Sequence, residues 1–438
     1  GNLTYKRYIK NSTAWFMVSS PVKNQDIDTF AKGHPLVEGS GSNRGLGSYN
    51  NSSPAWEYYQ DGTSNSGNFE LAKGHALRFT EAKNAEFTGS LETDNLSRSV
   101  SLGANGWNLL GNPYPSFISA NGAAQSTNNL IDINSNLLQS GFKAIYFWDS
   151  NEYKPFNNAS SAKFVAPGQG YFVRVNASSS EGNANTYMKI NENMQSHQTG
   201  DLFSRSNSDR FEINLKIMDG SIEKYTEIKY INGTTTGLDE GYDAGMFDGA
   251  NNSFAVYTHL VSDSDGTNYS LQALPDSNYE NMIVPLGINA SANTAITFSL
   301  ESIHIPSGLK IFLEDKEMET ITRLDETDSS YVVNTTSDIS GIGRFYIHTA
   351  SEVLVIEKET SLGKISIFKT DKLRIRILGL EAAKTTLKLF TLLGKEIIRK
   401  EFTAKNIEDV LLPKLSKGVY LLQIKTASGM LNKKIIFE

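Results

Sequence analysis

Residues 387–438 decide the fold at the end of the chain. They read LKLFTLLGKE from 387 to 396, LSKGVYLLQI from 415 to 424 and GMLNKKIIFE from 429 to 438. Apolar residues recur at every second position, as at Leu387 and Leu389, and this period of two is typical of half-buried β-strands. Glycines occupy the places where turns are expected, namely Gly394, Gly418 and Gly429. The stretch therefore predicts three short strands.

Three motifs follow one another in the same stretch. They are Gly394-Lys395-Glu396, then Lys417-Gly418 with Tyr420, then Lys433-Lys434 before a final apolar strand. With these motifs, roughly the last 75 residues resemble the type A C-terminal sorting domain of proteins exported by the Bacteroidetes type IX secretion system. The chain departs from that pattern at Lys417, which stands where the family often shows Pro-x-Gly.

The resemblance implies a separate and removable domain at residues 363–438, folded as an immunoglobulin-like β-sandwich. It implies export across the outer membrane to the cell surface or the extracellular space. The expected partners are the type IX translocon, its shuttle protein and a sortase. The family's sortase cleaves just ahead of the sorting domain, where residues 351–362 form a charged linker.

Composition limits the functions of the remaining residues. The 438 residues suffice for about three domains. A net charge of −7 argues against a nucleic-acid partner, which requires concentrated positive charge. Cysteine is absent, so the sequence offers no disulfide or zinc–thiolate site and favours an extracellular protein. No apolar run is long enough to cross a bilayer, and a start at Gly1 indicates a mature form or a fragment.

Residues 1–195 show an internal duplication. Trp15 and Trp107 lie 92 residues apart, and Trp56 and Trp148 keep the same spacing. Pro21 and Pro113, which follow the first tryptophan of each pair, also keep this spacing. These matches predict two related β units, at about 1–95 and 96–195.

About nine alternating segments follow between residues 196 and 350, with turn signals between them. This pattern predicts a central β-sandwich or jelly roll, in which Pro285 marks an edge strand or a bulge. The chain is therefore predicted to be all-β, with tandem sandwich-like or jelly-roll-like domains ahead of the sorting domain.

The paired tryptophans have two interpretations. A buried aromatic side chain removes about 150–250 Å² from water, so core packing is the simpler one. The alternative is a platform for a carbohydrate or another surface ligand, made by Trp56 and Trp148. Exposure of these two rings would decide between them.

An acidic loop is the candidate metal site. It contains Asp239, Asp243 and Asp248, and a second loop contains Asp263 and Asp265. Calcium binds about six to eight oxygens, often from such loops. Because aspartate is also a common turn residue, calcium is the only cofactor we consider and the alternative is that none binds.

No motif indicates catalysis. The six histidines are scattered, and no His-Glu-x-x-His or Gly-x-Ser-x-Gly pattern occurs. We therefore predict a non-enzymatic secreted or surface protein, such as the C-terminal part of an adhesin. The alternative is a carbohydrate-binding module or polysaccharide hydrolase fragment with the same sorting domain.

Overall fold

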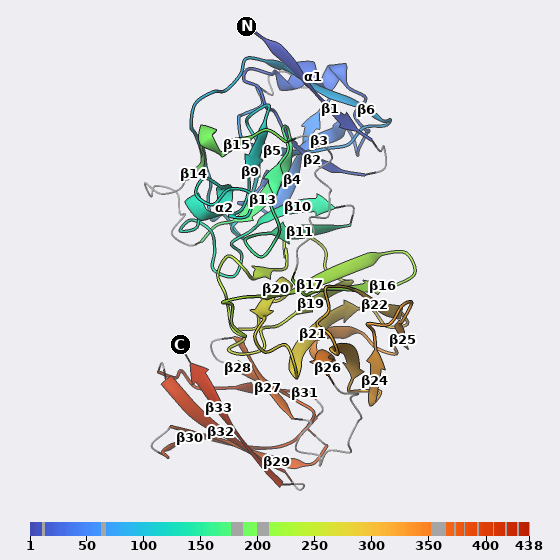
Figure 1. The fold of residues 1–438 in the computed structure, drawn as a ribbon, viewed down its shortest axis with the longest axis vertical. Coiled ribbons are helices and arrows are strands. Elements are labelled where there is room, and N and C mark those ends of the chain that lie inside the picture. The colour runs from blue at the N-terminus through green and yellow to red at the C-terminus, as the bar shows by residue number, and fades with distance from the viewer. Residues whose placement is uncertain are drawn as a thin grey trace. The chain divides into compact units, whose positions relative to one another are not determined.

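The computed structural model confirms the all-β prediction: strands hold 53% of the residues and helices 4%. None of the helices described is long and apolar enough to span a membrane. The structure describes residues 1–10, 14–62, 67–149, 151–176, 187–198, 210–351, 365–371, 374–380, 382–391, 394–405, 407–416, 418–426 and 429–437. Figure 1 shows the course of the chain from the first strands (blue) to the last (red).

The chain divides into two compact units. Unit 1 comprises residues 1–210 together with two later segments, 239–252 and 270–273. Unit 2 comprises residues 211–238, 253–269 and 274–438. The sequence did not indicate that segments from beyond residue 210 complete the first unit.

Two four-stranded sheets with the same strand order form the centre of unit 1. The first runs in the order β2 (Phe16–Ser19), β5 (Gly74–Leu77), β3 (Asn43–Asn50), β4 (Ala55–Gln60). The second runs in the order β8 (Trp107–Gly111), β13 (Gly170–Arg174), β10 (Ile145–Asp149), β11 (Glu152–Phe156). Duplication of residues 1–195 stays a prediction, and this shared order supports it.

The two sheets meet through reciprocal backbone contacts. The Ser19 N–H donates to the Gly168 carbonyl at 3.1 Å, and the Gly111 N–H donates to the Ala72 carbonyl at 3.0 Å. Gly168 and Ala72 both have left-handed backbone angles, with φ of 65° and 60°. In the first contact the first sheet donates to the second, and in the other the second sheet donates to the first from the equivalent position. The two sheets are therefore related by an approximate two-fold axis.

Smaller elements complete unit 1. The paired strands are β1 (Leu3–Ile9) with β6 (Lys83–Gly89), β7 (Leu96–Ser99) with β14 (Tyr187–Ile190), and β9 (Phe117–Ser119) between β12 (Phe164–Val165) and β15 (Gln195–Ser196). The helices are α1 (Ile27–Gly33), α2 (Leu130–Ile133) and the 3₁₀ helix η1 (Glu192–Met194). β18 (Ala244–Gly245) lies in segment 239–252 and pairs with β20 (Tyr269–Pro275).

One long antiparallel sheet forms the body of unit 2. Its order is β24 (Thr320–Arg323), β23 (Lys310–Asp315), β26 (Ile339–Ala350), β21 (Met282–Ala290), β19 (Ala255–Thr258), β20, β17 (Glu223–Ile231), β16 (Glu212–Met218), β22 (Ala295–Ile303), β25 (Tyr331–Asn334). Apolar side chains of most of these strands form one core cluster. The sheet therefore curls round its core like a sandwich or barrel.

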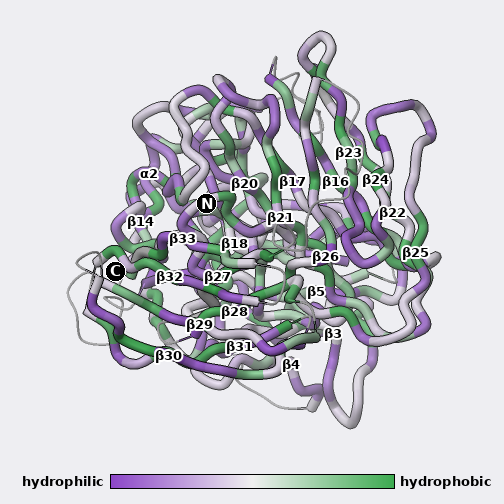
Figure 2. The backbone as a smooth tube through the Cα atoms, turned by 90° about the horizontal axis from the view of Figure 1, so that it is seen from below, coloured by the Kyte–Doolittle hydropathy of each residue, from purple (hydrophilic) through white to green (hydrophobic). Residues whose placement is uncertain are grey.

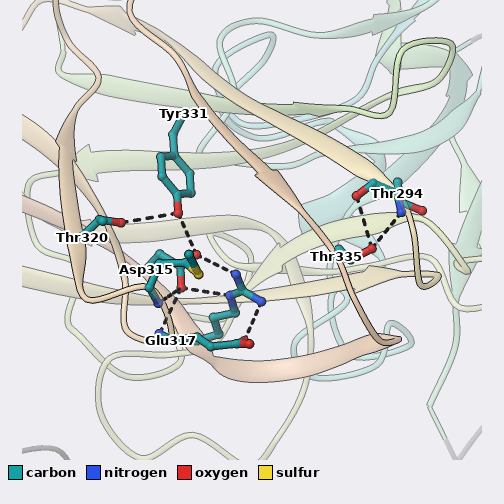
Figure 3. A network of polar contacts seen from close by, with 8 residues as sticks. Thr294, Asp315, Glu317, Thr320, Tyr331 and Thr335 are labelled. Carbon is teal, nitrogen blue, oxygen red and sulfur yellow. Dashed lines mark hydrogen bonds and ion pairs between the residues drawn. The ribbon is translucent and has the colours of Figure 1, made fainter.

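A buried carboxylate joins the two ends of this sheet (Figure 3). Asp315, at the end of β23, forms a two-pronged ion pair with Arg344, with N···O distances of 2.9 and 2.8 Å. The hydroxyl of Tyr331, on β25, donates to Asp315 at 2.9 Å and accepts from Thr320, on β24, at 3.4 Å. Because β24 and β25 end the strand order, the network holds the curled sheet closed.

We predict that Asp315→Asn destabilises unit 2. The Asp315 side chain is fully buried and that of Arg344 is 15% exposed, so the change leaves a largely buried guanidinium without its main partner. Breaking a buried pair from one side costs about 3–5 kcal/mol. Because all four tryptophans lie in unit 1, calorimetry should show a lower-melting transition that tryptophan fluorescence does not report.

Glu280→Gln is the matched control, because Glu280 is exposed and should tolerate the change. A melting curve for Asp315→Asn that overlays those of the wild type and this control would contradict the closing role of the network.

The C-terminal tail contributes seven strands in two sheets. One contains β27 (Ser366–Asp371), β28 (Arg374–Leu378) and β31 (Ile407–Leu411). The other contains β30 (Glu396–Thr403), β29 (Lys384–Thr391), β32 (Gly418–Thr426) and β33 (Gly429–Phe437). Fully buried residues from both sheets, including Ile375, Leu389 and Leu422, share one core. Buried positions alternate with more exposed ones along β29, as the period of two predicted. Figure 2 shows hydrophobic and hydrophilic stretches along the tail strands.

The central segments agree with the predicted strands, with one difference at Pro285. Its strand β21 lies inside the sheet between β26 and β19, not at an edge. The register against β26 shifts between Leu286 and Gly287, so the bulge alternative fits. The linker expected at 351–362 lies, except for Ser351, outside the described residues.

Candidate functional site

Paired aromatic rings lie at the same place in the two sheets of unit 1. In the first sheet, Tyr49 on β3 pairs across the strands with Trp56 on β4. In the second, Trp148 on β10 pairs with Tyr153 on β11. The centroids of the two rings are 5.5 Å apart in the first pair and 4.9 Å apart in the second.

The positions of these rings correct one match between the two predicted repeat units. The 92-residue spacing matched Trp56 with Trp148, but Trp56 lies on the last strand of its sheet and Trp148 on the third of its own. The structural counterpart of Trp56 is Tyr153, and that of Trp148 is Tyr49. Each sheet therefore keeps one tryptophan and one tyrosine, in exchanged order.

These rings line a pocket of about 210 Å³, which we call the aromatic pocket. Its aromatic lining residues are Trp15, Tyr49, Trp56, Tyr58, Trp148, Tyr153, Phe172 and Phe247, and its remaining lining residues are Met17, Ala76, Gly249 and Ala250. Trp15, Trp56 and Trp148 are only half-buried. The two predicted platform residues therefore belong to one open site.

Phe172 holds the wall rings in place. It is fully buried on β13, and the rings of Tyr49, Tyr153 and Phe247 meet it edge-on or steeply inclined, with centroid distances of 5.1, 5.2 and 5.0 Å. Such inclined contacts suit the charge distribution of aromatic rings and add about 0.5–1.5 kcal/mol each to the gain from burial. The pocket is therefore formed by packing within the protein and does not depend on a ligand.

Segment 239–252 supplies one wall of the pocket. Phe247 packs on Tyr153 and on Trp107, with centroid distances of 4.2 Å to each. The Trp107 indole N–H donates to the Asp248 carboxylate at 2.6 Å, and Arg174 forms an ion pair with the same carboxylate at 3.1 Å. These contacts fix the part of the segment that faces the pocket.

Asp243 anchors the same segment from inside. Its side chain is fully buried, and its carboxylate accepts the N–H of Asp239 at 2.6 Å and that of Ala273 at 2.7 Å. Burial raises the pKa of Asp243 to about 7, against the lowering effect of these two hydrogen bonds. The carboxyl group thus ties segment 239–252 to segment 270–273.

The acidic residues proposed for calcium are engaged separately. Asp243 binds backbone N–H groups, whereas Asp248 binds Trp107 and Arg174. Among the residues that the structure describes, no three His, Asp or Glu side chains gather as a metal would require. Calcium at Asp239, Asp243 and Asp248 stays a prediction from sequence.

The pocket's chemistry is that of binding and not of proton transfer. None of its twelve lining residues carries a carboxylate, an imidazole or a cationic group. Burial raises the pKa of Tyr49, Tyr58 and Tyr153, so these phenols stay neutral at physiological pH. The site offers flat apolar faces with a few neutral polar atoms.

Part of this site was visible in the sequence. Trp56 and Tyr58 are two residues apart on one strand, so the period of two places both on one face. No sequence pattern indicates Phe247, which reaches the pocket from a segment beyond residue 238. The sequence marks Trp15 only as part of the repeat, for which core packing is the simpler interpretation.

The predicted sorting residues begin at a tight turn between β29 and β30. Gly394 has φ of 83°, and its N–H donates to the Thr391 carbonyl at 2.9 Å. Lys395 is exposed, and its backbone carbonyl accepts a hydrogen bond from the Thr391 N–H at 2.9 Å. Glu396 starts β30 and pairs with Lys388 at 3.3 Å.

The second sorting motif leads into a core strand. Gly418 begins β32, and Tyr420 is buried with its hydroxyl donating to the Ser416 carbonyl at 2.7 Å. Tyr420 therefore closes the loop that precedes its strand. Lys417 lies outside the described residues.

The basic pair lies on the edge strand β33. Lys433 and Lys434 pair with Leu422 and Leu421 of β32 and are exposed. The Lys433 ammonium donates to the Ile367 carbonyl of the other sheet at 3.3 Å. The sorting residues that the structure describes thus lie at a turn, a loop and an edge of one small sandwich.

Comparisons with known proteins agree with this arrangement. A family model described as "Secretion system C-terminal sorting domain" matches residues 369–438. The protein is therefore a cargo of the type IX secretion machinery, exported across the outer membrane to the cell surface or extracellular space. A second model, "Domain of unknown function (DUF8693)", matches residues 1–348, so the chain belongs to that family. Neither description names an enzyme.

No curated protein matches the sequence. Among solved structures, a polysaccharide lyase is similar at 10% identity and a TM-score of 0.13. The match covers 52% of this chain, which spans only 39% of that structure. A likeness this weak carries no conclusion about fold or activity.

We predict that Asp243→Asn weakens unit 1 in a pH-dependent way. Asparagine has one carbonyl oxygen for two N–H donors, and an unsatisfied buried group costs about 1–3 kcal/mol. A raised folded pKa gives stability that is present at acidic pH and is lost as the pH rises through about 7. The difference in the free energy of unfolding between wild type and variant should therefore shrink from pH 5 to pH 7. Urea unfolding followed by tryptophan fluorescence measures it.

The exposed Glu81→Gln serves as the control and should leave the pH dependence of the wild type unchanged. If the difference between wild type and Asp243→Asn stays constant across this range, Asp243 does not titrate as described.

We also predict that deleting residues 387–438 stops export and leaves the protein in the periplasm. The deletion removes nine buried core residues of the tail, including Leu387, Leu389 and Tyr420, and all predicted sorting residues. Protease accessibility on intact cells measures surface delivery. Tryptophan fluorescence checks that unit 1 of the truncated chain is folded. If the folded truncated chain reaches the surface as the wild type does, the transport role of the tail is contradicted.

Proposed function

We propose that this type IX cargo is a non-catalytic glycan-binding protein that acts at the cell surface or outside the cell. One observation carries the proposal: three half-buried tryptophans and five further aromatic rings line a single open pocket. Such a surface offers its apolar faces to a ligand that is partly apolar and partly polar. Sugars have this character, because their rings combine apolar C–H faces with hydroxyl groups at the edge.

Stacking supplies the binding energy in this account. Removing apolar surface from water gains about 25 cal/mol per Å², and an indole ring presents a large flat face. The pocket walls are already packed against Phe172 and Phe247, so little ordering is needed when a ligand enters. This pre-organisation favours binding of one ring between the tryptophans.

The lining residues argue against hydrolysis at this pocket. Most glycosidases need two carboxyl groups about 5–9.5 Å apart that flank the sugar. The pocket has no carboxylate in its lining, and nearby Asp248 is engaged by Trp107 and Arg174. We therefore favour binding without cleavage, and an adhesive role on glycan-coated surfaces.

Delivery depends on specific partners, for which we propose the translocon, the shuttle protein and the sortase of the type IX system. The tail leaves apolar side chains on its edge strands: Ile407 and Leu411 on β31 are 52% and 54% exposed, and Met430 on β33 is 52% exposed. An exposed edge can pair with a strand of another protein. These edges support docking by strand addition.

We predict that Trp56→Ala and Trp148→Ala each abolish glycan binding. Each change removes one wall of the aromatic pocket while leaving the Phe172 floor in place. A glycan array probed with the full chain measures binding, and circular dichroism checks that each variant is folded.

Tyr8→Ala is the matched control, because Tyr8 is an exposed aromatic residue of the same unit and is absent from the pocket lining. It should bind as the wild type does. Binding by folded Trp56→Ala and Trp148→Ala at the wild-type level would overturn the proposed site.

A further inference from the structure

The approximate two-fold axis makes Trp15 and Trp107 counterparts. Trp15 immediately precedes β2, and Trp107 is the first residue of β8, the strand that matches β2 in the second sheet. The reciprocal backbone contacts near Ser19 and Gly111, each four residues further on, fix this correspondence. The fold therefore contains two equivalent places where a ring can pack on an indole.

Only one of these places is filled by the chain itself. Phe247 packs on Trp107 at a centroid distance of 4.2 Å, and Trp107 is fully buried. Trp15 remains half-buried and lines the aromatic pocket, and its one recorded aromatic neighbour among the described residues is Tyr58, at 5.7 Å. Segment 239–252 thus closes the site at Trp107 and leaves the site at Trp15 open.

We propose that the aromatic pocket takes a single uncharged sugar ring, the terminal residue of a glycan, which packs on Trp15 as Phe247 packs on Trp107. The inference rests on the proposed glycan-binding function. It adds the position of the ring, the charge class of the sugar and the recognition of a chain end.

The size of the pocket selects one ring. Its volume of about 210 Å³ is below the ~300–1,000 Å³ of pockets that enclose drug-sized ligands. Aromatic rings from both sheets and from segment 239–252 line this space. A sugar in the middle of a polymer would need an exit on both sides, whereas a terminal sugar needs one.

The charges around the pocket select an uncharged sugar. No lysine or arginine lines it, so the carboxylate of a uronic acid would lose its hydration without gaining a cationic partner. Arg174, close to the pocket, is already paired with Asp248 and so does not offer its charge to a uronate.

The test is calorimetric titration of the full chain with matched pairs of monosaccharides: glucose with glucuronate, galactose with galacturonate, and the neutral oligosaccharides that bind on the array. We expect at least one neutral sugar to bind and its uronate partner to bind at least about tenfold more weakly. Trp15→Ala should lower the affinity by at least about tenfold, whereas Trp15→Phe should keep most of it. Tyr8→Ala should leave it unchanged, and tryptophan fluorescence checks folding.

The outcomes separate this inference from the proposed function. Equal binding of uronates and neutral sugars, or full affinity in folded Trp15→Ala, overturns the inference, while sensitivity to Trp56→Ala and Trp148→Ala would leave glycan binding standing. Binding of internal segments of a polymer whose ends are blocked also overturns it. If no glycan binds the wild-type chain, both proposals fail.

Discussion

The closest approach of the two sheets in unit 1 is the constraint on which the site depends. A Cβ atom added to Gly111 would lie 2.1 Å from the Cβ atom of Ser19, so only glycine fits there. A Cβ added to Gly74 would meet the Leu110 carbonyl at 2.5 Å. Because the backbones touch, the aromatic faces of both sheets come within reach of a single small pocket. A larger side chain at the contact would force the sheets apart.

The symmetry of this contact is broken by a segment from later in the chain. Segment 239–252 is held by Asp243 inside unit 1 and by Asp248 at Trp107. It places Phe247 on one of the two equivalent indoles and leaves the other open. Two sheets with similar aromatic faces thereby share one pocket, which both sheets and segment 239–252 line.

The sequence predicted the features that depend on short-range pattern. Alternation located the strands of the sorting tail and most of the central sheet, because burial of one face repeats every two residues. It did not predict that Trp56 corresponds to Tyr153, because exchange of a tryptophan and a tyrosine within a cross-strand pair is invisible to residue matching. Nor did it predict Phe247 in the pocket, since that contact joins residues far apart in the chain.

Binding of a sugar ring over Trp15 is tested most directly by a crystal structure of the full chain with the neutral sugar that binds best. The account predicts electron density for one ring in the aromatic pocket, with its apolar face against the Trp15 indole and its hydroxyl edge toward solvent and Tyr58. Density for the sugar elsewhere on the chain, with the aromatic pocket empty, would contradict the account.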